Sequence, residues 1–165
     1  KEYDNVHNHE REGLVRVYYN NGQLESEKNY RYGKINGFVK SYHDNGQLAS
    51  EGAYKDNKRK GFWKFYYKNG QIKKRANYRY GKLRGYFKSY YESGYLQSEG
   101  NYIDIEELSG LWKFYYPNGE LKEEHIYINQ VLVSKILFKQ NDKETNQIPQ
   151  EFVRRYNPLI RPSVW

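Results

Sequence analysis

The sequence predicts an all-β protein, an elongated single-layer antiparallel β-meander of about five 24-residue hairpin repeats. Three observations support this fold class. Asn-Gly or Ser-Gly pairs recur at a nearly constant spacing along most of the chain. The segments that flank these pairs are rich in Tyr, Phe, Trp and Val, residues that β-strands favour. No segment between successive pairs is long enough to supply the connecting helix of a parallel sheet.

Two series of glycines set the length of the repeat. The first closes each Asn-Gly or Ser-Gly pair and consists of Gly22, Gly46, Gly70, Gly94 and Gly119. The second consists of Gly13, Gly37, Gly61, Gly85 and Gly110. Both advance in steps of 24, 24, 24 and 25 residues, and the extra residue lies between Tyr102 and Gly110. Because Asn and Gly both tolerate positive φ, each pair predicts a two-residue hairpin turn.

The elements follow in chain order from these turns. The five hairpins are expected to be centred on residues 21–22, 45–46, 69–70, 93–94 and 118–119. A second turn, Tyr-x-x-Gly-Lys, leads from each hairpin to the next, and residues 131–138 (VLVSKILF) are expected to form a last strand. No helix is expected before residue 139. We therefore divide the chain into a repeat domain, residues 1–138, and a C-terminal cap or tail, residues 139–165.

The tail differs in composition from the repeats. Pro149 suits the first turn of a short helix in the segment IPQEFVRRY. The tail is expected to cap the sheet, because repeat arrays need terminal elements with altered faces. Its expected apolar anchors are Phe152, Leu159, Ile160 and Trp165. A disordered tail is the alternative.

The alternation of side chains along a strand predicts two different faces. In the third hairpin the apolar face, which we call the core face, carries Trp63, Phe65, Tyr67, Ile72 and Tyr78. Later hairpins place equivalent residues there, namely Phe87, Tyr91, Leu96, Tyr102, Trp112, Phe114, Tyr116, Leu121 and Tyr127. Ile35, Leu83 and Leu108 link the repeats on this face, and Arg59 interrupts their row. A single layer cannot bury an apolar face alone, so it must roll up, dimerise or meet a partner.

The opposite face, which we call the ladder face, carries cross-strand charge pairs. If each turn has two residues, base opposes acid in the pairs Arg16–Glu27, Lys40–Glu51, Lys88–Glu99 and Lys113–Glu124. A three-residue turn would split these pairs between the two faces, so their regularity favours the two-residue turn. In the third hairpin Lys64 opposes Arg75, a like-charge pair that a sheet disfavours.

The positive charge of the protein is concentrated around this pair. The chain has 28 Lys and Arg against 20 Asp and Glu, whereas residues 55–85 contain 12 basic residues and one acid. A local surplus of this size attracts acidic partners. We predict an anion-responsive surface that consists of Lys58, Lys64, Lys73, Arg75 and Arg79. The alternative is ordinary solvated charge on a sheet.

Aromatic residues recur on the ladder face beside these cations. We predict a contact surface formed by Phe38, Phe62, Tyr66, Tyr86 and Tyr90, because tyrosine is large, rather rigid and amphipathic. The alternative is that these rows only stiffen the sheet. Basic and aromatic residues together also suit single-stranded nucleic acid. Nucleic acid is nevertheless not an expected partner, because the repeat already explains the aromatic spacing.

No pattern in the sequence indicates catalysis or a cofactor. The chain has no Cys, no phosphate-binding Gly-rich loop and no triad or carboxylate pair, so we expect a protein that is not an enzyme. His7 and His9 lack the further ligands that a metal needs. The sequence has no Met, even at position 1. Removal of a signal peptide would explain this and predict export, and a cytoplasmic location is the alternative.

The repeated phrase YYxNGQLxSExxYxxGKxxG resembles the bacterial variant of the MORN-repeat family over residues 13–134. The resemblance implies an elongated single-layer antiparallel sheet. Bacterial proteins of this variant are often labelled antitoxins of toxin–antitoxin pairs, and MORN repeats elsewhere are linked to membrane phospholipids and to dimerisation. The predicted function is therefore a protein-interaction module, an antitoxin-like binder of a cognate toxin or a self-associating dimer. Peripheral binding to acidic phospholipid membranes through the basic patch is the alternative.

Overall fold

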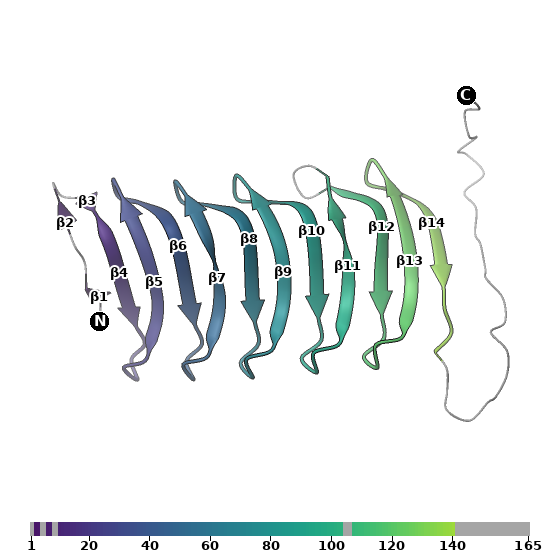
Figure 1. The fold of residues 1–165 in the computed structure, drawn as a ribbon, viewed down its shortest axis with the longest axis horizontal. Coiled ribbons are helices and arrows are strands. Elements are labelled where there is room, and N and C mark those ends of the chain that lie inside the picture. The colour runs from purple at the N-terminus through teal and green to yellow at the C-terminus, as the bar shows by residue number, and fades with distance from the viewer. Residues whose placement is uncertain (1, 4–5, 8–9, 104–106, 141–165) are drawn as a thin grey trace.

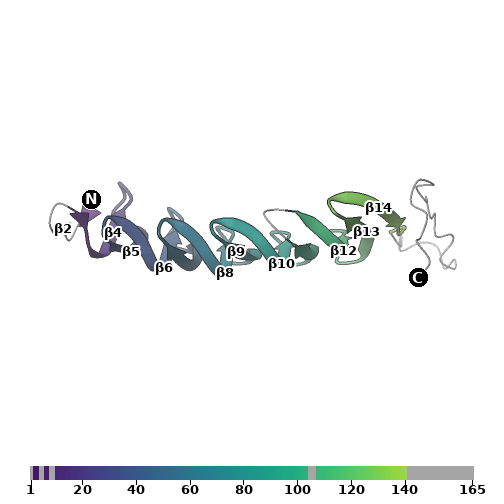
Figure 2. The same cartoon turned by 90° about the horizontal axis from the view of Figure 1, so that it is seen from above.

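The computed structural model of the protein describes residues 2–3, 6–7, 10–103 and 107–140. These residues form strands and turns, and one open sheet of 12 strands runs in chain order with every neighbouring pair antiparallel. Figure 1 shows the hairpins side by side in one row, and Figure 2 shows that the sheet is a thin single layer. The predicted β-meander is confirmed.

The main strands are β4 (Gly13–Tyr18), β5 (Leu24–Arg31), β6 (Lys34–Tyr42), β7 (Leu48–Lys55), β8 (Lys58–Tyr66), β9 (Ile72–Arg79), β10 (Lys82–Tyr90), β11 (Leu96–Tyr102), β12 (Leu108–Tyr115), β13 (Leu121–Ile128) and β14 (Val131–Leu137). Three short strands precede them, β1 (Glu2–Tyr3), β2 (Val6–His7) and β3 (Glu10–Arg11). Strand β1 pairs with β4 at one edge of the sheet, and β14 forms the other edge. The predicted last strand is therefore present, whereas the predicted cap, residues 139–165, lies outside the described residues from residue 141 onward.

The hairpin turns lie where the Asn-Gly pairs predict them, but they have three residues instead of two. In the first hairpin the Gly22 N–H donates to the Tyr19 carbonyl and the Tyr19 N–H donates to the Gln23 carbonyl. Only the glycine adopts positive φ, at 84°. This is a turn followed by a glycine bulge, in which the preceding Asn keeps an ordinary conformation. The other four hairpins repeat the same hydrogen bonds.

A second irregularity in each hairpin restores the predicted register. Beside the first turn Tyr18 pairs with Leu24, but the next pair is Val17 with Ser26, so one extra residue is inserted between them. The same shift follows every turn of this kind. The prediction that a three-residue turn would split the charge pairs was wrong, because this bulge compensates for the extra turn residue. It also pairs Ile72 with Tyr66 of the ladder face, although the sequence pattern predicts Ile72 on the core face together with Tyr67.

The turns that connect successive hairpins are tight two-residue turns with positive φ at both positions. Four of them are described, at Tyr32–Gly33, Asp56–Asn57, Tyr80–Gly81 and Asn129–Gln130. Three of these turns also donate a backbone hydrogen bond to the preceding connection, as from the Gly81 N–H to the Arg59 carbonyl. The turns therefore stack along one long edge of the molecule.

Side chains of the hairpin loops bind each repeat to the next. The amide of Asn45 accepts from the Gln47 N–H within its own turn and donates to the Lys68 carbonyl of the following turn, at 2.8 Å. Asn21 and Asn69 make the equivalent bonds. The Tyr67 hydroxyl likewise donates to the Tyr90 carbonyl one repeat further on. The Asn-Gly pair is thus explained by hydrogen bonding between repeats as well as by turn conformation.

The core face buries tryptophan although the sheet has only one layer. Trp63 is 1% exposed and Trp112 is 3% exposed. Each indole lies against a glycine of the preceding strand, and a Cβ at Gly52 or Gly100 would overlap the ring. The ring of Tyr54 packs edge-on against Trp63 with centroids 5.1 Å apart. Close backbone contact below and aromatic packing around the ring therefore remove each tryptophan from water.

Candidate functional site

The predicted charge pairs join into one continuous row across the ladder face. Hairpins pair with their neighbours in the same register as they pair internally, so Glu51 lies between Lys40 and Lys64. The whole row, which we call the charge row, is Arg16, Glu27, Lys40, Glu51, Lys64, Arg75, Lys88, Glu99, Lys113 and Glu124. Positive and negative residues alternate along it except at its centre.

Glu51 shows how the sheet holds a carboxylate in this row. Its Oε1 accepts hydrogen bonds from the Lys64 ammonium at 3.1 Å and from the Tyr66 hydroxyl at 2.8 Å. Burial alone would raise the pKa of Glu51, but these two donors outweigh it and hold the pKa below its ordinary value. Burial and the bond to Glu51 raise the pKa of Tyr66 to about 12. The lysine and the tyrosine therefore hold the glutamate carboxylate in a fixed, ionised arrangement.

Glu99 is held in the same way two hairpins along the chain. The Lys88 ammonium lies 2.8 Å from its Oε2, and the Tyr115 hydroxyl donates to its Oε1 at 2.7 Å. The hydrogen bond from Lys88 is the main cause that lowers the pKa of Glu99. The Arg16 guanidinium approaches Glu27 to 2.9 Å, and the Tyr42 hydroxyl reaches Glu27 at 3.4 Å. The unit of base, glutamate and tyrosine is thus a feature of the repeat.

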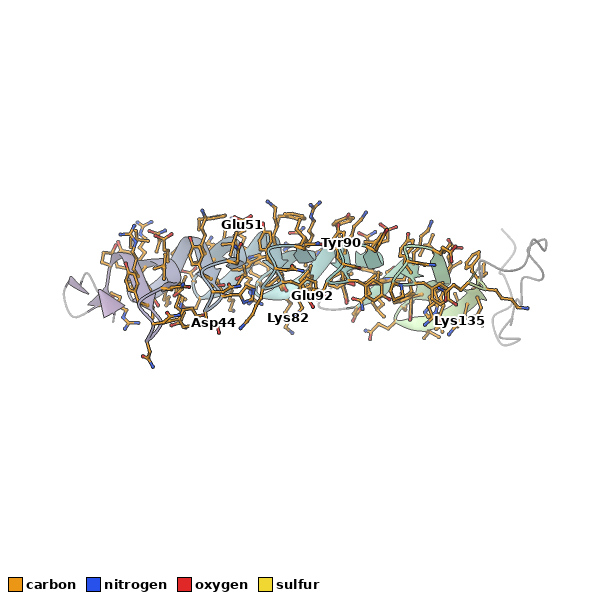
Figure 3. All side chains as sticks on the ribbon, turned by 90° about the horizontal axis from the view of Figure 1, so that it is seen from below. Asp44, Glu51, Lys82, Tyr90, Glu92 and Lys135 are labelled. Carbon is orange, nitrogen blue, oxygen red and sulfur yellow. The ribbon has the colours of Figure 1, made fainter. Side chains whose placement is uncertain are left out.

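The third hairpin breaks this unit because Arg75 stands where the glutamate should be. Arg75 pairs with Lys64 on β8 and with Lys88 on β10, so three cations follow one another. Lys64 forms an ion pair with Glu51, and Lys88 forms one with Glu99, each on the side away from Arg75. Neither lysine therefore brings a carboxylate to Arg75. Figure 3 shows Glu51 and Tyr90 on the same side of the layer.

Arg75 and Tyr90 lack the hydrogen bonds that their equivalents make. The Arg75 guanidinium lies 5.8 Å from the ring centroid of Tyr90, a cation–π contact. Its Nε is buried and has no hydrogen-bond partner. Tyr90 is the counterpart of Tyr66 and Tyr115, but its hydroxyl donates to no acceptor among the described residues. The centre of the charge row therefore contains unsatisfied donors and no acid.

The core face of the same hairpin also carries cations in place of uncharged residues. Arg59 occupies the position of Ile35 and Leu83, and its guanidinium lies 4.9 Å from the centroid of the Trp63 ring. Lys74 occupies the position of Ser50 and Ser98, and its ammonium lies 4.3 Å from the centroid of the Phe65 ring. The basic segment is therefore divided between both faces of the sheet.

Lys74 is the more perturbed of these two core-face cations. Burial is the main cause that lowers its pKa, and the nearby charges of Arg59 and Lys73 lower it further. Arg59 has a buried Nε without a hydrogen-bond partner. Both head groups are nevertheless occupied by contacts with aromatic rings of their own hairpin. These contacts make Arg59 and Lys74 part of the packing of the core face.

The five cations predicted to form one anion-responsive surface lie along the whole length of the β8–β9 hairpin. Lys64 and Arg75 are at its middle, in the charge row. Lys73 lies near the hairpin turn, with its ammonium 5.4 Å from the Tyr67 ring centroid. Lys58 and Arg79 lie at the opposite end, beside the connecting turns. The structure thus brings together two pairs of these residues and sets Lys73 apart.

A basic cleft of about 620 Å³ lies at the end of the hairpin that carries Lys58 and Arg79. Tyr80 lines it, and Asp56 is its one acidic lining residue. Its basic lining residues are Lys34, Lys55, Lys58, Arg59, Lys60 and Arg79. The strand ends at these turns pair base with base, as in Lys55 with Lys58 and Arg79 with Lys82. The cleft therefore extends the positive potential from the charge row to the edge of the sheet.

The predicted aromatic surface divides into an exposed row and a hydrogen-bonded row. Phe38, Phe62 and Tyr86 are 52%, 49% and 41% exposed, and Leu14 and Leu111 extend their row in the first and last hairpins. Tyr66 is only partly exposed, because its hydroxyl holds Glu51. The exposed row fits the predicted contact surface, whereas tyrosines in the position of Tyr66 also organise the charge row.

The structure places three cations beside or behind Arg75 whose positions there the sequence did not predict. Lys88 was paired with Glu99 inside its own hairpin, and its contact with Arg75 across hairpins was overlooked. Lys74 departs from a column of serines, and this departure could have been read from the aligned repeats. Arg59 was recognised as an interruption of the apolar row, but its place over Trp63 depends on side-chain packing.

The described residues contain no group of His, Asp and Glu that could hold a metal ion. The side chains of His7 and His9 are not among those that the structure describes. Among the described segments, no helix is long and apolar enough to cross a membrane.

Comparison with known families assigns the repeat. A family model described as "MORN repeat variant" matches five segments, residues 11–32, 36–56, 61–80, 83–104 and 108–129. Together these segments cover more than half of the chain, and each begins close to the start of one hairpin. No curated protein matches the chain.

Proposed function

Because the chain belongs to the MORN repeat variant family, whose repeats are generally regarded as mediating protein or membrane interactions, we propose that it is a binding module for an acidic partner protein. The binding surface is the ladder face of the third hairpin and its neighbours. In its most specific form, the partner is a toxin whose activity is neutralised by stoichiometric binding.

One observation carries this proposal, the interruption of the charge row at Arg75. Four glutamates of the row have basic neighbours that neutralise them, whereas Arg75 has a lysine on each side. Three adjacent cations cost folding free energy, since like charges opposite each other destabilise a sheet. A partner that supplies negative charge removes this cost and is attracted at long range.

The exposed aromatic row supports a protein as the partner. Phe62 and Tyr86 are about half exposed and lie on the strands that carry Lys64 and Lys88. Exposed aromatic residues beside charged ones are typical of the centre of a protein interface. The module therefore offers apolar contact area together with a positive potential.

The test is binding to the product of the neighbouring reading frame. The two proteins are co-expressed, purified and titrated by calorimetry at about 50 and 300 mM salt. We expect saturable one-to-one binding that weakens with salt, and a loss of affinity in Arg75→Glu. The control is Lys113→Glu, which changes a charge of the same face in the fifth hairpin. Unchanged affinity in Arg75→Glu with loss in Lys113→Glu would move the interface away from the third hairpin.

Binding to acidic phospholipid membranes is the second candidate. The basic residues of the connecting turns line a cleft at one edge of the sheet, and Phe38 and Phe62 are exposed on the ladder face. Sedimentation with phosphatidylcholine vesicles, with and without about 30% phosphatidylserine, tests it. Salt-sensitive binding to the acidic vesicles alone would favour a membrane surface. Self-association as a dimer is measured in parallel by analytical ultracentrifugation.

A further inference from the structure

We infer that the gap in the charge row is a docking site for a carboxylate side chain of an acidic protein segment, received between Arg75 and the Tyr90 hydroxyl. The inference rests on the proposed function and names the chemistry that the partner must bring. It identifies one position on the ladder face, whereas the proposed function requires only a basic surface.

The other repeats of the chain provide the template for this site. At Glu51 and at Glu99, a carboxylate lies between basic residues of the two adjacent strands and accepts a hydrogen bond from a tyrosine of the following strand. The third repeat keeps both flanking bases, Lys64 and Lys88, and keeps the tyrosine. It lacks only the carboxylate. A glutamate or aspartate from another chain can therefore complete an arrangement that this backbone already forms elsewhere.

Two unsatisfied donors show that the site is incomplete within the described residues. The Arg75 Nε is buried and makes no hydrogen bond. The Tyr90 hydroxyl donates to no acceptor, although Tyr66 and Tyr115 donate to glutamates at 2.8 and 2.7 Å. Leaving donors unpaired costs free energy that a carboxylate with two acceptor oxygens recovers. A guanidinium also offers the fork geometry that binds a carboxylate through two hydrogen bonds.

The surroundings of the gap favour a peptide over an isolated ion. Phe62 and Tyr86 are 49% and 41% exposed and lie on the two strands that flank β9. They can pack against apolar side chains that neighbour the docking carboxylate. The occupant that fits is therefore a segment in which acidic residues alternate with apolar or aromatic ones.

The core-face cations of the same hairpin do not offer an equivalent site. Arg59 lies over the rings of Trp63, Phe65 and Tyr78, at 4.9 to 5.4 Å from their centroids. Lys74 lies over Phe65. Their head groups are engaged with aromatic rings. The two adjacent repeats place Ser50 and Ser98 at the position of Lys74, and a carboxylate stands there only in the fifth repeat, as Glu123. Arg75 and Lys74 are thus adjacent cations with different predicted roles.

The experiment measures binding of a fluorescein-labelled peptide of alternating Glu and Phe to the full chain by fluorescence anisotropy at about 50 mM salt. The same peptide with Gln in place of Glu is the control probe. We expect the Glu peptide to bind and the Gln peptide to bind at least about tenfold more weakly. Equal binding of both peptides would overturn the carboxylate assignment. An oligothymidylate that displaces the peptide at lower concentration than unlabelled Glu peptide would also overturn it, by indicating a phosphate site.

Two variants with the same charge change locate the site. Arg75→Gln should weaken binding of the Glu peptide about tenfold, because it removes a charge-assisted hydrogen bond donor. Lys74→Gln removes one positive charge from the next residue on the other face, and it should weaken binding less than about threefold. Equal losses in the two variants would mean general electrostatic attraction without a docking position.

The hydroxyl of Tyr90 gives a test that leaves every charge unchanged. Tyr90→Phe should weaken binding of the Glu peptide about threefold and leave the circular dichroism spectrum and melting temperature unaltered, since the hydroxyl has no acceptor among the described residues. Full binding by this variant would contradict the proposed role of Tyr90.

Failure of this inference can be told apart from failure of the proposed function. If the Glu peptide binds and its affinity is insensitive to Arg75→Gln, the basic surface stands and the docking position is wrong. If neither the peptide nor the product of the neighbouring reading frame binds at low salt, both are wrong.

Discussion

The units around Glu99 and Arg75 share one backbone register but differ in the charge at their centre. Each is flanked by basic residues on both neighbouring strands and is followed by a tyrosine. Around Glu99 the donors converge on one carboxylate, and every member has a partner. Around Arg75 the flanking lysines bind other glutamates, and the guanidinium stacks on Tyr90. One difference between repeats thus separates a unit of paired charges around Glu99 from a run of three cations around Arg75.

The core below these two units is conserved within the chain although their charges differ. Trp63 and Trp112 each lie on a glycine and donate an indole hydrogen bond to a backbone carbonyl, at 3.1 and 3.2 Å. The repeat therefore separates a packing function, on the core face, from a variable charge pattern on the ladder face. A surface position can change its chemistry without a change in the fold because its side chain contributes little to the core.

The largest expected effect tests whether the two cores are equivalent. Trp63→Ala and Trp112→Ala should each lower the free energy of unfolding by about 3–5 kcal/mol, because each removes a fully buried aromatic side chain. Urea denaturation followed by tyrosine fluorescence measures both. A loss below about 1 kcal/mol for Trp63 alone would mean that Arg59 and its neighbours repack, and that the third hairpin has a different core.

The second-largest effect is expected when the charges at positions 99 and 75 are exchanged, which tests the charge difference between the two units. Glu99→Arg should lower the free energy of unfolding by about 1–2 kcal/mol, because it leaves Lys88 and the Tyr115 hydroxyl without their acceptor. Arg75→Glu should raise it by about 0.2–1 kcal/mol, because the new carboxylate gains bases on both sides and the Tyr90 hydroxyl. Denaturant melts of both variants and of the parent chain provide the comparison. Destabilisation by Arg75→Glu would show that the three-cation run is not a cost to the free fold.

The smallest effect concerns pH and distinguishes the two units by their titrating groups. The pKa values of Glu51 and Glu99 are lowered in the fold, so the stability that they contribute is present above the ordinary value of 4.5 and is lost as the pH falls below it. We expect the melting temperature of the parent chain to fall between about pH 4.5 and 2.5. The stabilisation of Arg75→Glu should disappear over the same range, since its carboxylate becomes protonated. Scanning calorimetry across this range measures both, and a gain that persists at pH 2.5 would exclude ion pairing as its origin.

The titration of tyrosines at high pH provides a matching control for the acid titration of the glutamates. Burial, together with hydrogen bonding to a carboxylate, raises the pKa of Tyr66 and Tyr115 to about 12. The stability that these tyrosines contribute is complete below their ordinary pKa of 10 and is lost as the pH rises through about 12. Tyrosinate absorbance near 295 nm should therefore show a late-titrating fraction that includes Tyr66 and Tyr115, and Tyr66→Phe should reduce this fraction by one group.

The sequence by itself determined the architecture, because the same pattern of turn and strand residues occurs five times. The glycine spacing and the strand composition predicted the antiparallel meander, its turns and the last strand at Val131–Leu137. The pairs Lys40–Glu51 and Lys113–Glu124 are confirmed as cross-strand neighbours, and Trp63 lies in the core, apart from Lys64. Period-two alternation fixes the face of a strand residue away from the bulges, so local information is sufficient for these features.

The tertiary structure decided what depends on contacts between repeats. Only the assembled sheet places Lys88 beside Arg75, because hairpins pair with each other as well as within themselves. Only side-chain packing sets Arg59 over Trp63, and only the bulge beside each turn reconciles a three-residue loop with the predicted charge pairs. Hydrogen bonds and bulges depend on backbone geometry that residue types do not specify. The fold followed from the periodic pattern of the sequence, whereas the run of three cations at Arg75 followed from the one repeat that departs from it and from its pairing with the next hairpin.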